Sequence, residues 1–274
     1  SKLFKSDIKF NIFTRGAIIQ SQNFFIYIIK LTFWQIYAIL SKFIEIELFC
    51  SSYYEIYRIS SKIFIPNNLK FSLCYDHKTS YDYLNLDNFE LTSNRIKKDN
   101  IKILLASRYS WDKGINQSLH LLSKLSPNNL AKLELVIVGC KLDLRKKFPN
   151  LSKKIKFIEF THRKNILQEM SKADIFLAPS MSESYGWTVI EALQMGCKVI
   201  VTSSSPWAFT GENKYIKPIN PLLENIKPKD FFKLIKQLNK IPNKKISFQN
   251  SIKIIENSDL NWKRSIKKKL TINY

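Results

Sequence analysis

Apolar residues in the second half of the chain form short runs that alternate with amphipathic segments. After Asn100, these runs predict buried strands at 101–106, 133–139, 155–160, 174–180 and 197–203. The intervening segments predict helices at 114–124, 141–148, 165–171, 188–195 and 229–238. Buried strands that alternate with helices are typical of a parallel sheet covered on both faces. The pattern therefore predicts an α/β fold with a complete, Rossmann-like, doubly wound domain over residues 96–240.

The first 95 residues have a different pattern. They predict short strands at 9–13, 48–50 and 62–66, a long aromatic-rich helical region at 22–47 and a helix at 54–59. The polar stretch 72–100, rich in Asp and Asn, is typical of a linker. These few strands fall short of a complete sheet, so the segment is interpreted as part of a domain. The aromatic residues of 24–37 are expected to pack as core or against a membrane surface.

Composition sets the class of protein. A chain of 274 residues with 45% hydrophobic content can bury a substantial core. Its four cysteines are scattered, with neither C-x-x-C spacing nor neighbouring histidines, so we expect no metal cluster and a reducing, cytoplasmic setting. Charged residues interrupt the apolar region 24–50 and the N-terminus, which predicts neither a membrane-spanning helix nor a signal peptide.

The formal net charge of +22 is unevenly distributed. From Lys227 onward the chain has thirteen Lys or Arg residues against three acids. A coding bias toward Lys, Asn and Ile explains the excess without any partner. Anionic lipid headgroups, polyanionic substrates and nucleic acid also suit such a tail, and charge alone does not choose among them.

Two acids flank a glycine in the stretch 182–193, which follows the predicted strand 174–180. In parallel α/β sheets, ligands bind beyond the carboxyl ends of the strands. Gly186 permits a tight turn before a helix whose free amides attract phosphate. Glu183 then lies in the loop and Glu191 about one turn into the helix, on the face opposite the sheet. The alternative that both acids are solvated surface groups stays open at this point.

Cations occupy the loop after the strand 101–106. Arg108 and Lys113 stand just before Gly114, where the next helix begins. A planar donor fork and a point charge together suit a diphosphate. Gly139 ends the next strand, where it lets the backbone approach a ligand closely. Cations and acids are thus predicted to converge on one edge of the sheet.

Four motifs occur in order along this domain: R-x4-KG at 108–114, IVG at 137–139, ADIFLAPS at 173–180 and E-x7-E from Glu183 to Glu191. Together they resemble the retaining glycosyltransferases of family 4, which have the GT-B fold. Further segments resemble the bacterial lipopolysaccharide and exopolysaccharide members of that family, namely SSSPW at 203–207, Trp262, Arg15-Gly16 and IPNN at 65–68.

The resemblance implies a donor site for a nucleotide diphosphate sugar, such as a UDP- or GDP-sugar. Arg108 and Lys113 are expected on the diphosphate. Glu191 is expected on the ribose hydroxyls and Glu183 on the transferred sugar. The other expected contacts are Gly139 and the backbone of Tyr185, Gly186, Trp187 and Thr188 near the phosphate and sugar, and Thr161 and His162 near the base. No metal-binding DxD motif is present, so the resemblance implies metal-independent transfer with no other cofactor.

The resemblance also implies how the chain is divided into domains. Residues 1–95 are expected to be the C-terminal remnant of an acceptor-side domain plus a linker, 96–240 the donor domain, and 241–274 basic helices that cross back toward the N-terminal domain. Cys140-Lys141 and the segment 204–207 replace glycines of the family pattern. The family's glycine-rich loop and catalytic histidine are absent upstream, so roughly the first hundred residues of a complete enzyme are expected to be missing.

The expected function is transfer of the sugar, with retention, to a saccharide or lipid-linked acceptor in cell-surface polysaccharide biosynthesis. The expected setting is cytoplasmic, with an anionic membrane surface on the inner membrane as a further partner. One alternative is a non-catalytic remnant that binds the donor. The other, a basic nucleic-acid-binding protein, is disfavoured because the tail lacks interleaved aromatic residues and any nucleic-acid motif. The sequence does not name the base, the sugar or the acceptor.

Overall fold

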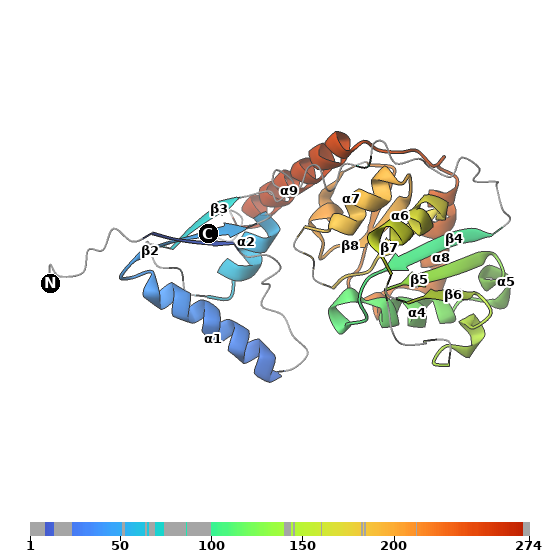
Figure 1. The fold of residues 1–274 in the computed structure, drawn as a ribbon, viewed down its shortest axis with the longest axis horizontal. Helices are drawn as coiled ribbons and strands as arrows, with labels where there is room; N and C mark the ends of the chain where they lie inside the picture. The colour runs from blue at the N-terminus through green and yellow to red at the C-terminus, as the bar shows by residue number, and fades with distance from the viewer. Residues whose placement is uncertain are drawn as a thin grey trace.

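Two parallel sheets form the framework of the chain, one in each of two units (Figure 1). The computed structural model describes residues 9–13, 24–50, 53–63, 65, 69–73, 86, 100–139, 144, 146–159, 161–181, 183, 185–211 and 213–270. The first unit holds a three-stranded sheet with the order β1-β2-β3, and the second a six-stranded sheet with the order β6-β5-β4-β7-β8-β9.

The six-stranded sheet is parallel throughout. Its strands are β4 (Ile101–Ala106), β5 (Leu133–Val138), β6 (Ile155–Ile158), β7 (Ile175–Ala178), β8 (Lys198–Thr202) and β9 (Ile216–Ile219). The chain moves outward from β4 to β6, returns to place β7 beside β4, and then continues outward to β9. The direction of the strand order thus reverses between β4 and β7, a position where α/β sheets bind ligands.

The five strands predicted for this domain are confirmed, and β9 is a strand that the prediction missed. The strand was missed because it contains Pro218. Proline cannot donate a ladder hydrogen bond, so its presence argues against a strand. The strand can hold this residue because β9 lies at the edge of the sheet.

Helices cover both faces of the six-stranded sheet, as the doubly wound prediction requires (Figure 1). They are α4 (Ile115–Ser123), α5 (Pro127–Leu130), α6 (Arg163–Lys172), α7 (Trp187–Gln194), α8 (Pro228–Asn239) and α9 (Phe248–Leu270). Alternate strand residues enter opposite cores. Leu104 and Phe176 pack with residues of α6, α7 and α9, whereas Ile103 and Ile175 pack with residues of α4 and α8.

Four predicted helices are confirmed with ends shifted by a few residues. The helix predicted at 141–148 lies largely outside the described residues. Its described positions 144 and 146–148 are not helical, and a short 3₁₀ turn, η3 (Pro149–Leu151), follows them. The other 3₁₀ turns are η2 (Trp111–Lys113), η4 (Pro206–Phe209) and η5 (Leu223–Asn225).

The first unit consists of β1 (Lys9–Phe13), α1 (Phe24–Leu40), β2 (Glu45–Cys50), α2 (Tyr53–Ser60) and β3 (Leu69–Leu73). The helix predicted at 22–47 ends earlier, because the segment from Glu45 alternates apolar and polar residues and forms β2, with Ile46 and Leu48 buried. The strand predicted at 62–66 is not found at its described positions 62, 63 and 65, and positions 64 and 66 lie outside the described residues. Lys62 lies in the turn after α2, and the strand forms at 69–73, of which positions 72 and 73 had been assigned to the linker.

Helix α9 contacts both units. In the first unit, Asp259 Oδ2 accepts a hydrogen bond from the backbone N of Tyr53 at 2.9 Å, and Lys263 Nζ lies 3.9 Å from the centre of the Tyr53 ring. In the second unit, Ser258 Oγ accepts from the backbone N of Phe209 in η4 at 3.0 Å. The C-terminal segment thus runs back to the N-terminal unit. Among the described residues, no helix has both the length and the hydropathy needed to cross a bilayer.

Candidate functional site

The loops that follow β4 and β7 meet at the carboxyl edge of the six-stranded sheet. Met181 N donates a hydrogen bond to Asp112 O at 2.7 Å, which joins the two loops through their backbones. Gly114 has φ +65°, and a Cβ there would lie 2.1 Å from the carbonyl oxygen of Pro179. Only glycine fits this position, since any side chain would push the two loops apart.

Lys113 and Glu183, predicted on separate loops, are brought together here. Lys113 Nζ lies 3.0 Å from Glu183 Oε2, and the two side chains are 20% and 21% exposed. The pair therefore sits where the strand order reverses, with each partner supplied by one of the two central strands. A ligand from solvent can reach both groups.

Arg108 lies in the same loop as Lys113, and its side chain is exposed. In the part of the chain that the structure describes, no hydrogen bond or ion pair holds its guanidinium group. Gly139, at the end of β5, has φ +84°, and a Cβ there would lie 3.2 Å from Ser107 O. Gly139 thus lets the loop after β5 lie close to the loop that carries Arg108.

The turn before α7 rests on a tryptophan that the sequence analysis did not place in the site. Trp207, which is 0% exposed, donates a hydrogen bond from Nε1 to the carbonyl oxygen of Tyr185 at 2.6 Å. Gly186 has φ +82°, and a Cβ there would lie 2.9 Å from the same Nε1 atom. The SSSPW segment was the available signal, since it contains this residue.

The residues around Gly186 differ in how deeply they are buried. The Tyr185 side chain is buried, and its ring centre lies 4.5 Å from that of Trp187. Trp187 and Thr188 are half-buried in the first turn of α7. The side chain of Tyr185 is therefore a packing element, and its carbonyl oxygen is bonded to Trp207.

Glu191 is not a solvated acid. Its side chain is 11% exposed, and Oε1 accepts a hydrogen bond from Arg163 Nε at 2.7 Å. Burial raises the pKa of Glu191 above its usual value, while the hydrogen bond and charge of Arg163 act in the opposite direction. Sequence analysis missed Arg163, because the helix that it begins was predicted to start two residues later.

Thr161 and His162 immediately precede this arginine. His162 is the exposed N-cap residue of α6, and Thr161 Oγ1 accepts a hydrogen bond from Asn165 Nδ2 at 2.6 Å. Arg163 thus connects the loop that holds these residues to Glu191 in α7. The two positions expected near the base are therefore linked through Arg163 to Glu191, the position expected on the ribose.

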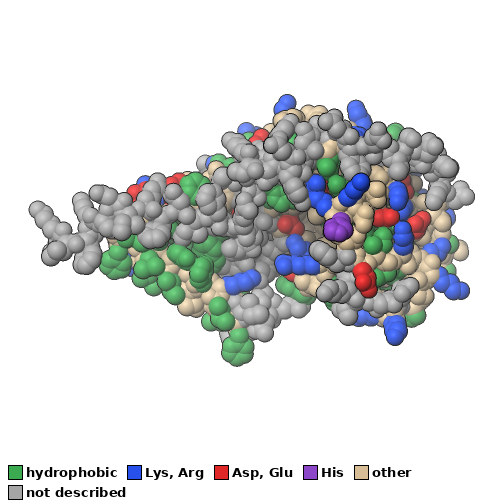
Figure 2. All heavy atoms as spheres, viewed as in Figure 1, with side chains coloured by type: hydrophobic (Ala, Val, Ile, Leu, Met, Phe, Trp, Pro, Cys, Tyr) green, Lys and Arg blue, Asp and Glu red, His purple; other side chains and the backbone are tan. Residues whose placement is uncertain are grey.

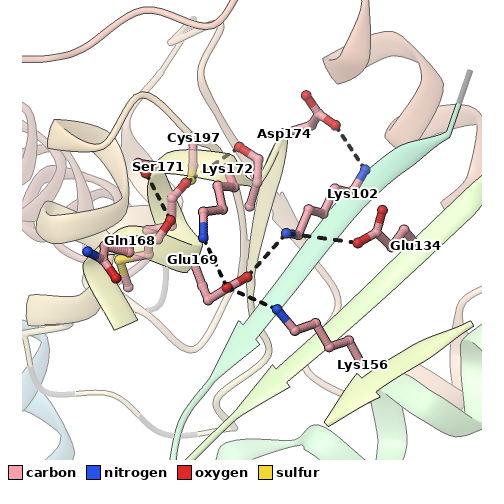
Figure 3. Close-up of polar contacts among 11 residues, drawn as sticks. Lys102, Glu134, Lys156, Gln168, Glu169, Ser171, Lys172, Asp174 and Cys197 are labelled. Atoms are coloured by element: carbon pink, nitrogen blue, oxygen red, sulfur yellow. Dashed lines mark hydrogen bonds and ion pairs between the residues drawn. The ribbon is translucent and has the colours of Figure 1, made fainter. Parts of the chain in front are cut away.

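A second cluster of charges lies at the opposite edge of the same sheet, near the amino ends of the strands (Figure 3). Glu169 on α6 pairs with Lys102 Nζ at 3.1 Å, Lys156 Nζ at 3.2 Å and Lys172 Nζ at 3.4 Å. Burial alone would raise the pKa of Glu169, but hydrogen bonds and charge from Lys102 and Lys156 outweigh it and hold the pKa below its usual value. Glu169 is thus a structural acid.

Candidate metal ligands do not gather in the part of the chain that the structure describes. Within it, no group of three or more His, Cys, Asp or Glu side chains is arranged to hold a metal ion.

Three solved structures illustrate the similarity in fold. Anabaena HepE, solved with UDP-glucose, has a TM-score of 0.58 and 14% identity over 96% of this chain and 71% of its own. The pneumococcal O-GlcNAc transferase GtfA, solved with UDP and GlcNAc, has a TM-score of 0.57 and 17% identity over 87% and 48%. Sucrose-phosphate synthase from Thermosynechococcus elongatus has a TM-score of 0.56 and 14% identity over 89% and 62%. No curated protein sequence matches the chain.

These likenesses define the fold as α/β of the GT-B type. The present chain spans 62% of the sucrose-phosphate synthase chain and 48% of the GtfA chain. Residues 88–251 match the family described as glycosyl transferases group 1. The chain therefore belongs to the group 1 glycosyltransferases.

Proposed function

We propose that the chain takes part in transferring a sugar from a nucleotide diphosphate sugar to a saccharide or lipid-linked acceptor, with retention at the anomeric carbon. The observation that carries the proposal is the Lys113–Glu183 pair at the β4–β7 reversal, next to the start of α7. Membership of group 1 supports sugar transfer. The nucleotide ligands in the HepE and GtfA structures support a nucleotide sugar as donor.

The diphosphate is assigned to Arg108 and Lys113. Both lie on the loop after β4, and the amides at the start of α7 add partial positive charge nearby. Glu183 would be a poor phosphate ligand, because its carboxylate repels an anion. Its distance of 3.0 Å from Lys113 instead supports an assignment to the sugar that would be attached to the diphosphate. Its oxygens then accept hydrogen bonds from the sugar hydroxyls.

The ribose is assigned to Glu191. Arg163 holds Oε1, and Oε2 accepts no hydrogen bond from the described residues. A carboxylate with one oxygen fixed and the other available can accept hydrogen bonds from the ribose hydroxyls. Arg163 then acts as a positioning residue, since it sets the orientation of the acid without itself reaching the sugar.

Departure of the nucleotide leaves negative charge on its diphosphate. The cations of the β4 loop and the amides of α7 stabilise that charge, and no metal or other cofactor is part of the proposal. For retention, the acceptor approaches the same face of the sugar that the diphosphate leaves. Positioning of donor and acceptor then contributes more than a protein nucleophile. The proposed setting is cell-surface polysaccharide synthesis in the bacterial cytoplasm, at the inner face of the membrane.

Nucleotide titration tests the phosphate assignment. We expect Arg108→Ala/Lys113→Ala to weaken binding of UDP or GDP by about 2–5 kcal/mol, as measured by isothermal titration calorimetry. The matched control is Lys132→Ala/Lys240→Ala, which removes two exposed cations away from this edge. Equal affinities in the wild type and the Arg108/Lys113 variant would refute the assignment. Equal losses in both double variants would show that only net charge matters.

A further inference from the structure

Several hydrogen bonds hold Trp207 in η4, the 3₁₀ turn that follows β8. The side chain is fully buried, and the backbone N of Trp207 donates to Ser205 Oγ at 3.3 Å. The carbonyl oxygen of Pro206 accepts a hydrogen bond from Ser258 Oγ in α9. The same Oγ accepts from the backbone N of Phe209 at 3.0 Å. The position of the indole is therefore set by its own turn and by α9.

The indole in turn fixes one peptide group of the turn before α7. Trp207 Nε1 donates to the carbonyl oxygen of Tyr185 at 2.6 Å, and that carbonyl belongs to the same peptide as the amide of Gly186. The peptide is trans, so its C=O and N–H bonds point in opposite directions. A carbonyl held toward Trp207 therefore turns the Gly186 N–H away from it. The backbone of Gly186 also packs directly on the indole, since a Cβ there would lie 2.9 Å from Nε1.

The Gly186 N–H is directed toward the side of the site that carries the cations. The turn η4 follows β8 on one side of β7, whereas the loop with Arg108 and Lys113 follows β4 on the other side. An amide turned away from η4 therefore faces the β4 side. Among the described residues, no acceptor takes a hydrogen bond from Gly186 N. An oriented amide at a helix N-terminus that has no partner in the fold suits an anionic oxygen.

Positive charge by itself does not select this position for a diphosphate. Figure 2 shows Lys and Arg side chains at many places on the visible face of the second unit. Such cations attract an anion without fixing its orientation, whereas a hydrogen bond from a fixed amide sets both distance and direction. We propose that Trp207 is a positioning residue for donor binding, which aims the Gly186 amide at the diphosphate without touching the ligand. The inference rests on the proposed function, because it names a further determinant of the same site.

Trp207→Phe tests the proposal, because it removes the Nε1 donor and keeps an aromatic ring in the core. Without that donor the peptide is no longer held, and the Gly186 amide loses its direction. The affinity for UDP or GDP, whichever the wild type binds more tightly, should fall at least about tenfold in isothermal titration calorimetry. The affinity for the corresponding nucleoside, which has no phosphate, should be unchanged in an NMR titration. A merely structural role would weaken nucleotide and nucleoside binding alike.

Trp34→Phe is the matched control variant. Trp34 is 3% exposed and packs in the core of the first unit. Both Trp→Phe substitutions should lower the free energy of unfolding in urea, because each shrinks a buried side chain. Only Trp207→Phe should lose nucleotide affinity. An equal loss of affinity in the two variants would overturn the proposal, since destabilisation alone would then explain the effect.

Ser258→Ala changes the support of η4 without altering Trp207, and it decides the question if Trp207→Phe does not fold. It removes the hydroxyl that bonds to Pro206 and Phe209, so nucleotide affinity should fall by a smaller factor, again with nucleoside affinity unchanged. The proposal is overturned if each folded variant binds the nucleotide as the wild type does. With a wild type that binds nucleotide, this result leaves the proposed function standing. A wild type that binds neither UDP nor GDP overturns both.

Discussion

Replacement of Glu191 by glutamine separates a binding role from a structural one. The substitution keeps the shape of the side chain and removes the negative charge. Because Oε1 is hydrogen-bonded to Arg163 and Oε2 remains for a ribose, the expected loss is that of a hydrogen bond to a charged group. Such a bond contributes about 1.5–3 kcal/mol, so the dissociation constants of UDP and of UDP-sugar should both rise about 10- to 150-fold.

Stability should respond differently to the same change. Glutamine avoids the cost of burying a charge, and its Oε1 can still accept the hydrogen bond from Arg163 Nε. We therefore expect the free energy of unfolding in urea to change by less than about 1 kcal/mol. A large affinity loss with little stability loss identifies a ligand-binding acid.

Glu169→Gln is the matched control for this prediction. Glu169 is buried to a similar extent and is likewise paired with cations, but it lies at the opposite edge of the sheet. Its replacement should lower the free energy of unfolding by about 2–3 kcal/mol and leave the UDP affinity unchanged. Calorimetric titration of both variants, alongside urea unfolding, distinguishes the two roles. If Glu191→Gln binds UDP as tightly as the wild type, then the ribose assignment is wrong.

Three further predictions concern the same domain. Glu183→Ala should leave UDP affinity within about twofold and weaken UDP-sugar binding by about 1.5–3 kcal/mol in calorimetry; equal effects on the two ligands would contradict its assignment to the sugar. Gly114→Ala should lower the free energy of unfolding in urea more than Gly211→Ala, which should cost about 1–2 kcal/mol. Both glycines have φ +65°, but only a Cβ at Gly114 meets Pro179 O, so equal costs would contradict the loop contact. The pKa of Glu169 is lower in the folded chain, so its contribution is present above the unfolded pKa and lost as pH falls through the folded one. Wild-type stability should therefore decline more steeply on acidification than that of Glu169→Gln, as measured by urea unfolding across acidic pH; parallel declines would contradict the role of its lysine partners.

The fold of the second unit was predictable because its pattern is local. Buried strands such as β4 and β7 are mostly apolar, and each is followed by a glycine or charged loop at a recognisable distance. The convergence of Lys113 and Glu183 followed from the rule that parallel strands present their carboxyl ends at one edge. The prediction failed where tertiary context decided the outcome. Strand β9 contains a proline that only its edge position makes acceptable.

The sequence pattern did not predict contacts between residues that are far apart in the chain. Arg163 and Glu191 are 28 positions apart, and nothing in their spacing indicates an ion pair. Trp207 lies 22 positions from Tyr185, the residue whose carbonyl it binds. In the first unit, the apolar residues of α1 have the composition of a core helix, and only the structure distinguishes the side that packs on β2 from the side that does not.

Trp207 also determines how large a segment must be exchanged to test whether the loop after β7 sets the proposed donor specificity. The turn at Gly186 fits against the indole, and the indole is held in a segment whose Pro206 carbonyl accepts a hydrogen bond from Ser258 in α9. A graft of residues 181–188 from a relative would place foreign backbone on an unaltered tryptophan. The smallest transferable module therefore comprises the loop, residues 203–207 and the part of α9 that contacts them, although these three pieces are not contiguous in the sequence.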